Sequence, residues 1–423
     1  MRSVTKSAHA WIVWLLGALF MFYKFALEVS PSIMTDTLMR TFQVNATQLG
    51  NFAACYFYAY LLLQLPAGLL LDRFGSRKVA TVAITVCALG NLLFANSSSF
   101  LLATTGRFFI GAGAAFATIN AFKLTANWFP LRRFAFLSGL VVTVAMIGAV
   151  GGQAPLAAFI QKMGWRPALE ILGFGGLGLA LLFVLIVRDK PTGHREEKKQ
   201  PHVPMLRGLK KVLSNPQSWW ISIYSGFAFA PVMVFGGLWG VSFIAEAYNL
   251  EHAIAAQSVS LMFIGFAVGT PFFGWLSDRL DRRKKVLFWG TTIALLSISA
   301  VIYLPDASHF LLMTLLLIFG FSIGAYVLSF SMISEINAVT LAATAMGFLN
   351  AFNALFGAFS DPLTGFFLDL GFDGTVVDGV RHFSLEDYRM ALFTLPLYLF
   401  LSLLTLCKIK ETRHKHVITT PPP

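Results

Sequence analysis

The first long apolar segment contains two ionisable residues at positions where charge is costly. Lys24 and Glu28 stand four positions apart in "FYKFALEVSPSIM", within an apolar run from Trp11 to Pro31 that is long enough to span a bilayer. A charge near the centre of such a helix costs about 2.5–3.5 kcal/mol on insertion scales, so residues of this kind usually line a pathway. At this spacing they share one helix face and could simply neutralise each other. We expect Lys24 to bind substrate and Glu28 to exchange a proton.

The other apolar segments contain a small set of polar side chains that could contact a solute. All eight histidines lie in loops or tails, so a proton carrier within the membrane must be a carboxylate. Asp361, followed by Pro362, is the second candidate for proton coupling. The candidate substrate-binding residues besides Lys24 are Arg107, Lys123, Tyr224, Trp239, Tyr326, Asn350 and Asn353.

Composition indicates which structure must position these side chains. The 423 residues are 57% hydrophobic and only 12% charged, with a mean hydropathy of +0.70, which exceeds what a soluble domain needs. The sequence predicts an all-α polytopic membrane protein with about twelve spans. Their expected ranges are 11–33, 48–71, 79–96, 101–126, 134–158, 167–187, 219–244, 254–276, 286–304, 310–333, 341–367 and 391–408.

The distribution of basic residues predicts the orientation of these spans. If both termini are cytoplasmic, most of the 32 Lys and Arg residues fall on the cytoplasmic side. The expected outer loops contain only Arg40, Lys162, Arg166, Arg381 and Arg389. The net charge of +12 therefore reflects topology and contact with anionic lipid, and nucleic-acid binding is not needed to explain it.

The cysteines and the N-terminal segment exclude several other classes. Cys55, Cys87 and Cys407 fall in expected spans without metal-ligand spacing, so no disulfide framework, metal site or cofactor is expected. The sequence contains no nucleophile motif of the kind that marks enzymes, so we do not expect an enzyme. The first apolar run is too long for a cleavable signal peptide and is expected to remain as the first helix.

A repeated loop sequence indicates that the chain contains two related halves. "GLLLDRFGSRK" (68–78) follows the second span, and "GWLSDRLDRRK" (274–284) follows the eighth, six spans later. We expect a six-helix bundle at 1–188, a cytoplasmic linker with a short amphipathic helix at 189–218, a second bundle at 219–410 and a tail at 411–423.

At this point the sequence resembles the major facilitator superfamily of secondary transporters. The family's loop signature is matched in the first half by Gly68, Asp72, Arg73, Gly75, Arg77 and Lys78, and in the second by Gly274, Asp278, Arg279 and Arg283, with Asp281 in place of the inner glycine. The resemblance implies that this loop stabilises a closed state of a cytoplasmic gate. "RFFIGAGAA", beginning at Arg107, resembles the family's fourth-helix motif. Helices one, four, seven and ten line the cavity in this family, and Arg107 lies at a depth where it could pair with Glu28.

Further sequence tracts indicate which branch of the family the chain resembles. Gln153 stands where the antiporter motif has proline, which disfavours drug/proton antiport. "QLPAGLLLDRFG", "NWFPLRR" and "GWR" look like the organic anion:cation symporters and related nutrient porters, although Ala114 and Ala115 replace the acidic residue that this branch often carries.

The sequence therefore predicts a monomeric transporter of the bacterial inner membrane, surrounded by lipid. Its substrate would be an organic acid, an amino acid or a short peptide, carried by alternating access and by proton symport. An uncoupled facilitator, an exporter of another small solute and a transport-dead receptor remain alternatives.

Overall fold

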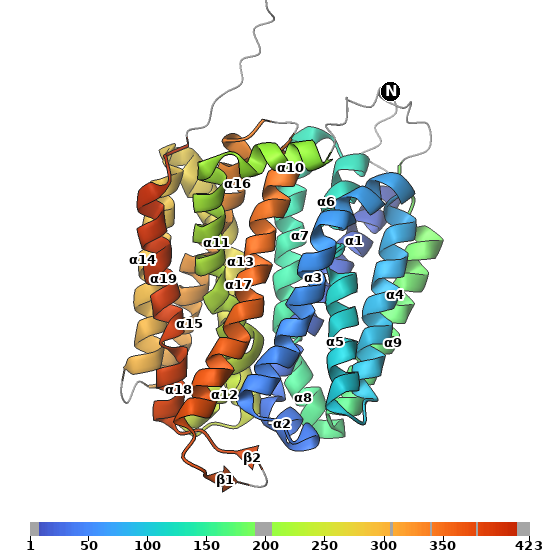
Figure 1. Ribbon diagram of the computed structural model, residues 1–423. Coiled ribbons are helices and arrows are strands. Elements are labelled where there is room, and N and C mark those ends of the chain that lie inside the picture. The colour runs from blue at the N-terminus through green and yellow to red at the C-terminus, as the bar shows by residue number, and fades with distance from the viewer. Residues whose placement is uncertain (1–7, 191–204, 305–307, 339–340, 378–379, 413–423) are drawn as a thin grey trace, which may run out of the picture.

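The protein is almost entirely helical (Figure 1). The computed structural model describes residues 8–190, 205–304, 308–338, 341–377 and 380–412. Within them, eleven helical segments are long and apolar enough to span a membrane, and the bent helix α3 makes a twelfth. This confirms the predicted fold class of an all-α polytopic membrane protein.

The helices before the linker follow the predicted spans, with some continuing beyond the apolar runs. They are α1 (Ala8–Val29), η2 (Ser30–Ile33), α2 (Thr35–Phe42), α3 (Ala46–Phe74), α4 (Ser76–Ala95), α5 (Phe100–Ala114), α6 (Ala117–Trp128), α7 (Leu131–Gly151), α8 (Ala154–Met163) and α9 (Trp165–Ile186). The start of α3 shows why an element exceeds its apolar run. Asn45 and Gln48 form a reciprocal capping box, which satisfies main-chain N–H groups before the apolar sequence begins.

The second part of the chain repeats this pattern after a short amphipathic helix, α10 (Met205–Leu213). It contains α11 (Pro216–Val234), η3 (Phe235–Trp239), α12 (Gly240–Tyr248), α13 (His252–Leu280), α14 (Arg283–Tyr303), α15 (His309–Ile323), η4 (Gly324–Val327), α16 (Leu328–Glu335) and α17 (Ala342–Gly371). The strands β1 (Val376–Val377) and β2 (Val380–Arg381) pair antiparallel, and α18 (Leu385–Leu392) and α19 (Thr394–Lys408) follow.

Two ends of the molecule serve as landmarks. Helix α10 lies across one end, which we call the linker side, and the β1–β2 hairpin lies at the other, which we call the hairpin side (Figure 1). Helix α3 runs from the hairpin side to the linker side and bends by 55° between Gln64 and Pro66. A proline in a helix interior removes one main-chain hydrogen bond, which accounts for the bend.

The helices form two packed groups that meet along a shared interface. In the first group α1 packs against α7 and α4 against α5 and α9; in the second α11 packs against α17 and α19, and α13 against α15. The groups meet where α3 packs along α17 and where α7 and α8 pack against α13. The contact between α1 and α7 requires glycine, since a Cβ atom at Gly148 would overlap the main chain of Phe22.

Several spans change their helical geometry partway through the membrane. A 3₁₀ turn, η2, follows α1; α5 and α6 are separated at Ala115–Phe116; a π-helical turn, η3, interrupts the span from α11 to α12; and a 3₁₀ turn, η4, separates α15 from α16. Such interruptions release main-chain groups from the regular ladder, and they are frequent at functional sites. These four lie in the spans expected to line the cavity, and a further break, at Gly152–Gln153, separates α7 from α8.

Candidate functional site

The site is built around the Lys24–Glu28 pair on α1. The two side chains form a salt bridge and are 6% and 3% exposed. The Tyr56 hydroxyl of α3 donates a hydrogen bond to Glu28 Oε2 at 2.7 Å. Lys24 Nζ also lies 3.7 Å from the centre of the Phe25 ring and 5.3 Å from that of Tyr60. The pair expected from sequence spacing is therefore formed, and aromatic rings surround its cation.

Arg107 joins this site through the main chain of α1. Its guanidinium donates hydrogen bonds to the carbonyl oxygens of Leu27 and Glu28, each at 2.6 Å, and lies 4.8 Å from the Tyr56 ring centre. These carbonyls belong to the last turn of α1, where the regular helical hydrogen bonds end, and the Leu27 oxygen also accepts one from the Ser30 hydroxyl. The expected pairing of Arg107 with Glu28 thus takes a different form, because the guanidinium bonds the main chain of Glu28 and its carboxylate is held by Lys24 and Tyr56.

The second half of the chain contributes a carboxylate to the same region. Asp361 of α17 is buried, lies within electrostatic range of Arg107 and Glu28, and its Oδ1 atom has no hydrogen-bond partner among the described residues. Trp239, at the end of the π-helical turn η3, donates from Nε1 to the main-chain oxygen of Asp361 at 3.4 Å. An unpartnered buried carboxylate oxygen is costly, which makes this position a natural acceptor for a proton or a cationic group.

Two aromatic residues of α3, Tyr56 and Tyr60, connect the charged cluster to the second half. Their rings stack at a centroid distance of 6.1 Å, and Asn350 of α17 donates to the Tyr60 hydroxyl at 3.1 Å. Tyr326, in η4, stacks on Phe229 and lies within electrostatic range of Tyr60 and Glu28. We call this group of residues the charged cluster. It consists of the ionisable residues Lys24, Glu28, Arg107 and Asp361 and of the neighbouring Tyr56, Tyr60, Tyr326 and Asn350.

Three of the residues predicted to bind substrate are engaged elsewhere. Tyr224 exchanges a hydrogen bond with Thr291 at 2.7 Å, and Asn353 accepts one from Ser225 at 2.8 Å, both within the second group of helices. Lys123 lies at the linker side, where its ammonium group contacts Asp72 Oδ1 at 2.7 Å and the Leu71 carbonyl at 2.6 Å. The structure thus places Lys123 with the loop motif and not with the charged cluster.

The loop motifs make their ion pairs within their own halves at the linker side. Besides the Asp72–Lys123 pair, the main-chain N–H of Arg77 donates to Asp189 and its guanidinium to the Val184 carbonyl. In the second copy, Arg283 lies 2.7 Å from Glu335 and 3.6 Å from Asp278. Of the remaining motif residues, Gly68 and Gly274 lie inside the last two turns of α3 and α13, and the others are at helix ends or between helices: Arg73, Gly75, Lys78 and Arg279.

The hairpin side joins the two halves through several polar contacts that sequence reasoning missed. Asp369 of α17 accepts hydrogen bonds from the N–H groups of Ala46 and Thr47 at the start of α3, at 3.2 and 2.7 Å, and it also pairs with Arg381. Gln153 donates to the Gly236 carbonyl at 2.6 Å, and Asp36 lies 3.2 Å from His252. The described state is therefore closed on the hairpin side.

Some of the residues that sequence analysis missed could have been found from local sequence, and others could not. Tyr56 and Tyr60 stand four positions apart, as Lys24 and Glu28 do, so an aromatic pair on one helix face was a usable signal. No local pattern around Asp369 reveals that it caps a helix more than 300 residues earlier in the chain.

Comparisons with known proteins agree with this architecture. A profile described as Major Facilitator Superfamily matches residues 13–360 and 229–421. The chain is 24% identical over 389 residues to a probable sulfoacetate transporter of Cupriavidus necator, covering 87% of this chain and 89% of the relative. It is 21% identical over 406 residues to a probable galactarate/D-glucarate transporter of Bacillus subtilis (88% and 89%), and 24% identical over 365 residues to a membrane sensor protein of Salmonella typhimurium (80% of each). An inward-facing bacterial homolog of the human lysosomal transporter Spinster superposes with a TM-score of 0.77, at 17% identity, over 95% of this chain and 96% of its own.

Proposed function

Because this chain belongs to the Major Facilitator Superfamily, we propose that it carries a small carboxylate-bearing or zwitterionic metabolite across the membrane by proton-coupled alternating access. The observation that carries this proposal is the charged cluster. Two cations and two carboxylates from both halves of the chain are buried together where the two groups of helices meet. Intramembrane charges of this kind mark solute and proton pathways.

The cations provide the means to bind an anion. Lys24 and Arg107 are both on the first group of helices, and Arg107 keeps its guanidinium on main-chain carbonyls that do not neutralise its full charge. A substrate carboxylate that approaches this guanidinium would gain charge-assisted hydrogen bonds. Relatives with the names sulfoacetate transporter and galactarate/D-glucarate transporter fit this chemistry, since both names denote organic anions.

Charge balance supports the coupling of transport to protons. With Lys24, Arg107, Glu28 and Asp361 all ionised, the charged cluster is neutral, so a bound monocarboxylate adds one uncompensated negative charge. Buried uncompensated charge is strongly unfavourable, and one proton on Glu28 or Asp361 removes it. By this count a monocarboxylate should enter with one proton and a dianion with two, whereas a zwitterion needs none for neutrality.

The remaining parts of the proposal concern topology and cycle. We place the linker side in the cytoplasm of a bacterial cell, with both termini inside and the protein acting as a monomer in the inner membrane. Residues 1–188 and 219–410 then form the two bundles that move relative to each other, connected by 189–218. On this assignment the state closed on the hairpin side opens inward, and the loops containing Asp72 and Asp278 form the cytoplasmic gate.

Uptake into proteoliposomes tests the proposal. The purified protein should accumulate labelled organic acids or amino acids when an inward proton gradient is imposed. Glu28→Gln, which mimics the protonated acid, should lose accumulation driven by the gradient but retain counterflow exchange. Glu170→Gln, which removes a carboxylate from α9 outside the charged cluster and outside both gates, serves as the control for loss of an acid within a span. Accumulation by Glu28→Gln equal to that of the native protein would exclude Glu28 and leave Asp361 as the proton carrier.

A sensor function is the second candidate, and the similarity to a membrane sensor protein favours it. A receptor of this kind would bind the same ligands at the charged cluster without turnover. Ligand-dependent thermal stabilisation together with an absence of counterflow in proteoliposomes would support the sensor. Counterflow by the native protein would exclude it.

A further inference from the structure

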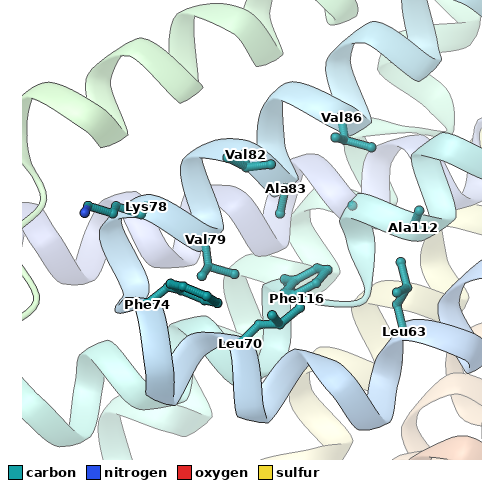
Figure 2. Close-up of a pocket in the computed structure, with 11 residues that line it drawn as sticks. Leu63, Leu70, Phe74, Lys78, Val79, Val82, Ala83, Val86, Ala112 and Phe116 are labelled. Carbon is teal, nitrogen blue, oxygen red and sulfur yellow. The ribbon is translucent and has the colours of Figure 1, made fainter.

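A lipid-facing groove lies between α3, α4 and the break between α5 and α6. It has a volume of about 360 Å³, and its walls include Leu63, Leu70 and Phe74 of α3, Val79 and Val82 of α4, and Phe116 (Figure 2). All of these side chains are apolar. Val82 is 63% exposed and Phe74 is 50% exposed, so the groove opens towards the surroundings of the helices, where the bilayer lies.

The floor of the groove is closed, which separates it from the charged cluster. Ala83 and Gly113 form this floor, and a Cβ atom at Gly113 would overlap the main-chain oxygen of Ala83. Helices α4 and α5 are therefore in direct contact beneath the groove. An occupant would reach it sideways from the membrane and not from the substrate pathway.

The length of the groove matches one leaflet. Leu63 and Phe74 are eleven positions apart on α3, which at 1.5 Å per residue is about 16 Å along the helix and somewhat less end to end, because α3 bends between Gln64 and Pro66. Half of a hydrocarbon core is about 15 Å. The groove runs from the linker-side end of α3 towards the middle of the membrane, so an acyl chain of a lipid in the linker-side leaflet has the required depth.

The mouth of the groove is cationic. Lys78 stands at this end in Figure 2, and it forms no hydrogen bond or ion pair within the described ranges. The guanidinium of Arg73 lies 5.2 Å from the centre of the Phe74 ring, directly beside the wall. Of the nearby carboxylates, Asp72 pairs with Lys123, and Asp189, which accepts from the main chain of Arg77, is one negative charge against the three cations Arg73, Arg77 and Lys78. Two cations are thus available to a head group.

We propose that this groove binds a phospholipid with an anionic head group. One acyl chain fills the apolar channel, and the head-group phosphate and its additional negative charge contact Lys78 and Arg73. Basic pockets between membrane helices on the cytoplasmic side select such lipids. Both cations also belong to the loop motif, so the bound lipid contacts the same segment that we assign to the gate.

Native mass spectrometry of the full chain, released from nanodiscs of phosphatidylcholine with phosphatidylglycerol, tests the proposal without a transport substrate. We expect retained phosphatidylglycerol to exceed phosphatidylcholine. Lys78→Gln and Arg73→Gln should each weaken the retention of phosphatidylglycerol about fivefold. The matched control is Arg279→Gln, which removes an exposed cation beside Trp275 in the second copy of the motif and should leave phosphatidylglycerol retention unchanged.

A second variant tests the apolar channel. Val82→Trp should reduce retention of the lipid, whereas Leu89→Trp, two turns further along the same exposed face of α4, should not. Equal retention of the two lipids by the native protein would overturn the proposal, because the groove would then hold ordinary solvating lipid. Unchanged phosphatidylglycerol retention in Lys78→Gln and Val82→Trp would place the lipid elsewhere.

Discussion

Removing one charge of the Lys24–Glu28 pair should destabilise the protein far more than removing both. Lys24→Met leaves a buried carboxylate with the Tyr56 hydroxyl as its remaining hydrogen-bond donor. Two unit charges within 4 Å at an effective dielectric constant of 20 attract by about 4 kcal/mol, and breaking a buried pair typically costs about 3–5 kcal/mol. We therefore expect Lys24→Met to lower the free energy of unfolding by about 3–5 kcal/mol.

The opposite variant should be milder because of the aromatic rings around the cation. In Glu28→Gln the Lys24 ammonium group keeps Phe25, Tyr56 and Tyr60 within 3.7–5.8 Å of their ring centres. Cation–π attraction of a desolvated ammonium is worth about 2 kcal/mol, so the expected loss falls to about 1–3 kcal/mol. The double variant Lys24→Met/Glu28→Gln buries neither charge and should lie within about 1 kcal/mol of the native protein.

Unfolding in detergent gives the three free energies, and counterflow in proteoliposomes gives the function. The double variant should be stable but inactive, since it lacks the cation that we assign to substrate. If its loss of stability equals the sum of the two single losses, the side chains are not energetically coupled and the reasoning fails. If it is stable and still transports, the pair serves packing alone.

Three other perturbations test the gates and the second acid. Asp72→Asn should slow transport at least tenfold with little change in substrate affinity, because it alters the Asp72–Lys123 pair outside the charged cluster; equal losses of binding and rate would contradict this. Asp369→Asn removes the charged acceptor of the hydrogen bonds at the start of α3, and hydrogen bonds to charged groups are worth about 1.5–3 kcal/mol. The fraction of molecules open on the hairpin side should therefore rise at least tenfold, which spin-label distances across that side would measure. Asp361→Asn should abolish the dependence of organic-acid uptake on the proton gradient if Asp361 is the proton carrier, and an unchanged ratio of protons to substrate would assign that role to Glu28.

Local sequence features were sufficient to predict the elements of the fold. Apolar runs and the two loop motifs predicted an all-helical membrane protein with about twelve spans, because each signal depends on residues close together in the chain. The Lys24–Glu28 pair was also predictable, since residues four apart on a helix are neighbours in any fold.

The partners of single charges could not be predicted in the same way. Lys123 was expected with the substrate-binding residues because it is on a cavity-forming span, but its position near the end of α6 brings it to Asp72. Depth along a span decides such partners, and an apolar run does not define depth to within a helical turn. The bonds of Arg107 to carbonyl oxygens are similarly hidden, because every residue carries a carbonyl and only the end of a helix leaves it free.

The attachment of Arg107 to the main chain has a consequence for how such a carrier can diverge. A carbonyl oxygen is present whatever side chain its residue bears, so substitutions at positions 27 and 28 leave both anchoring hydrogen bonds in place. Evolution can therefore exchange the side chains around the cation, and with them the preferred solute, without first losing the cation itself.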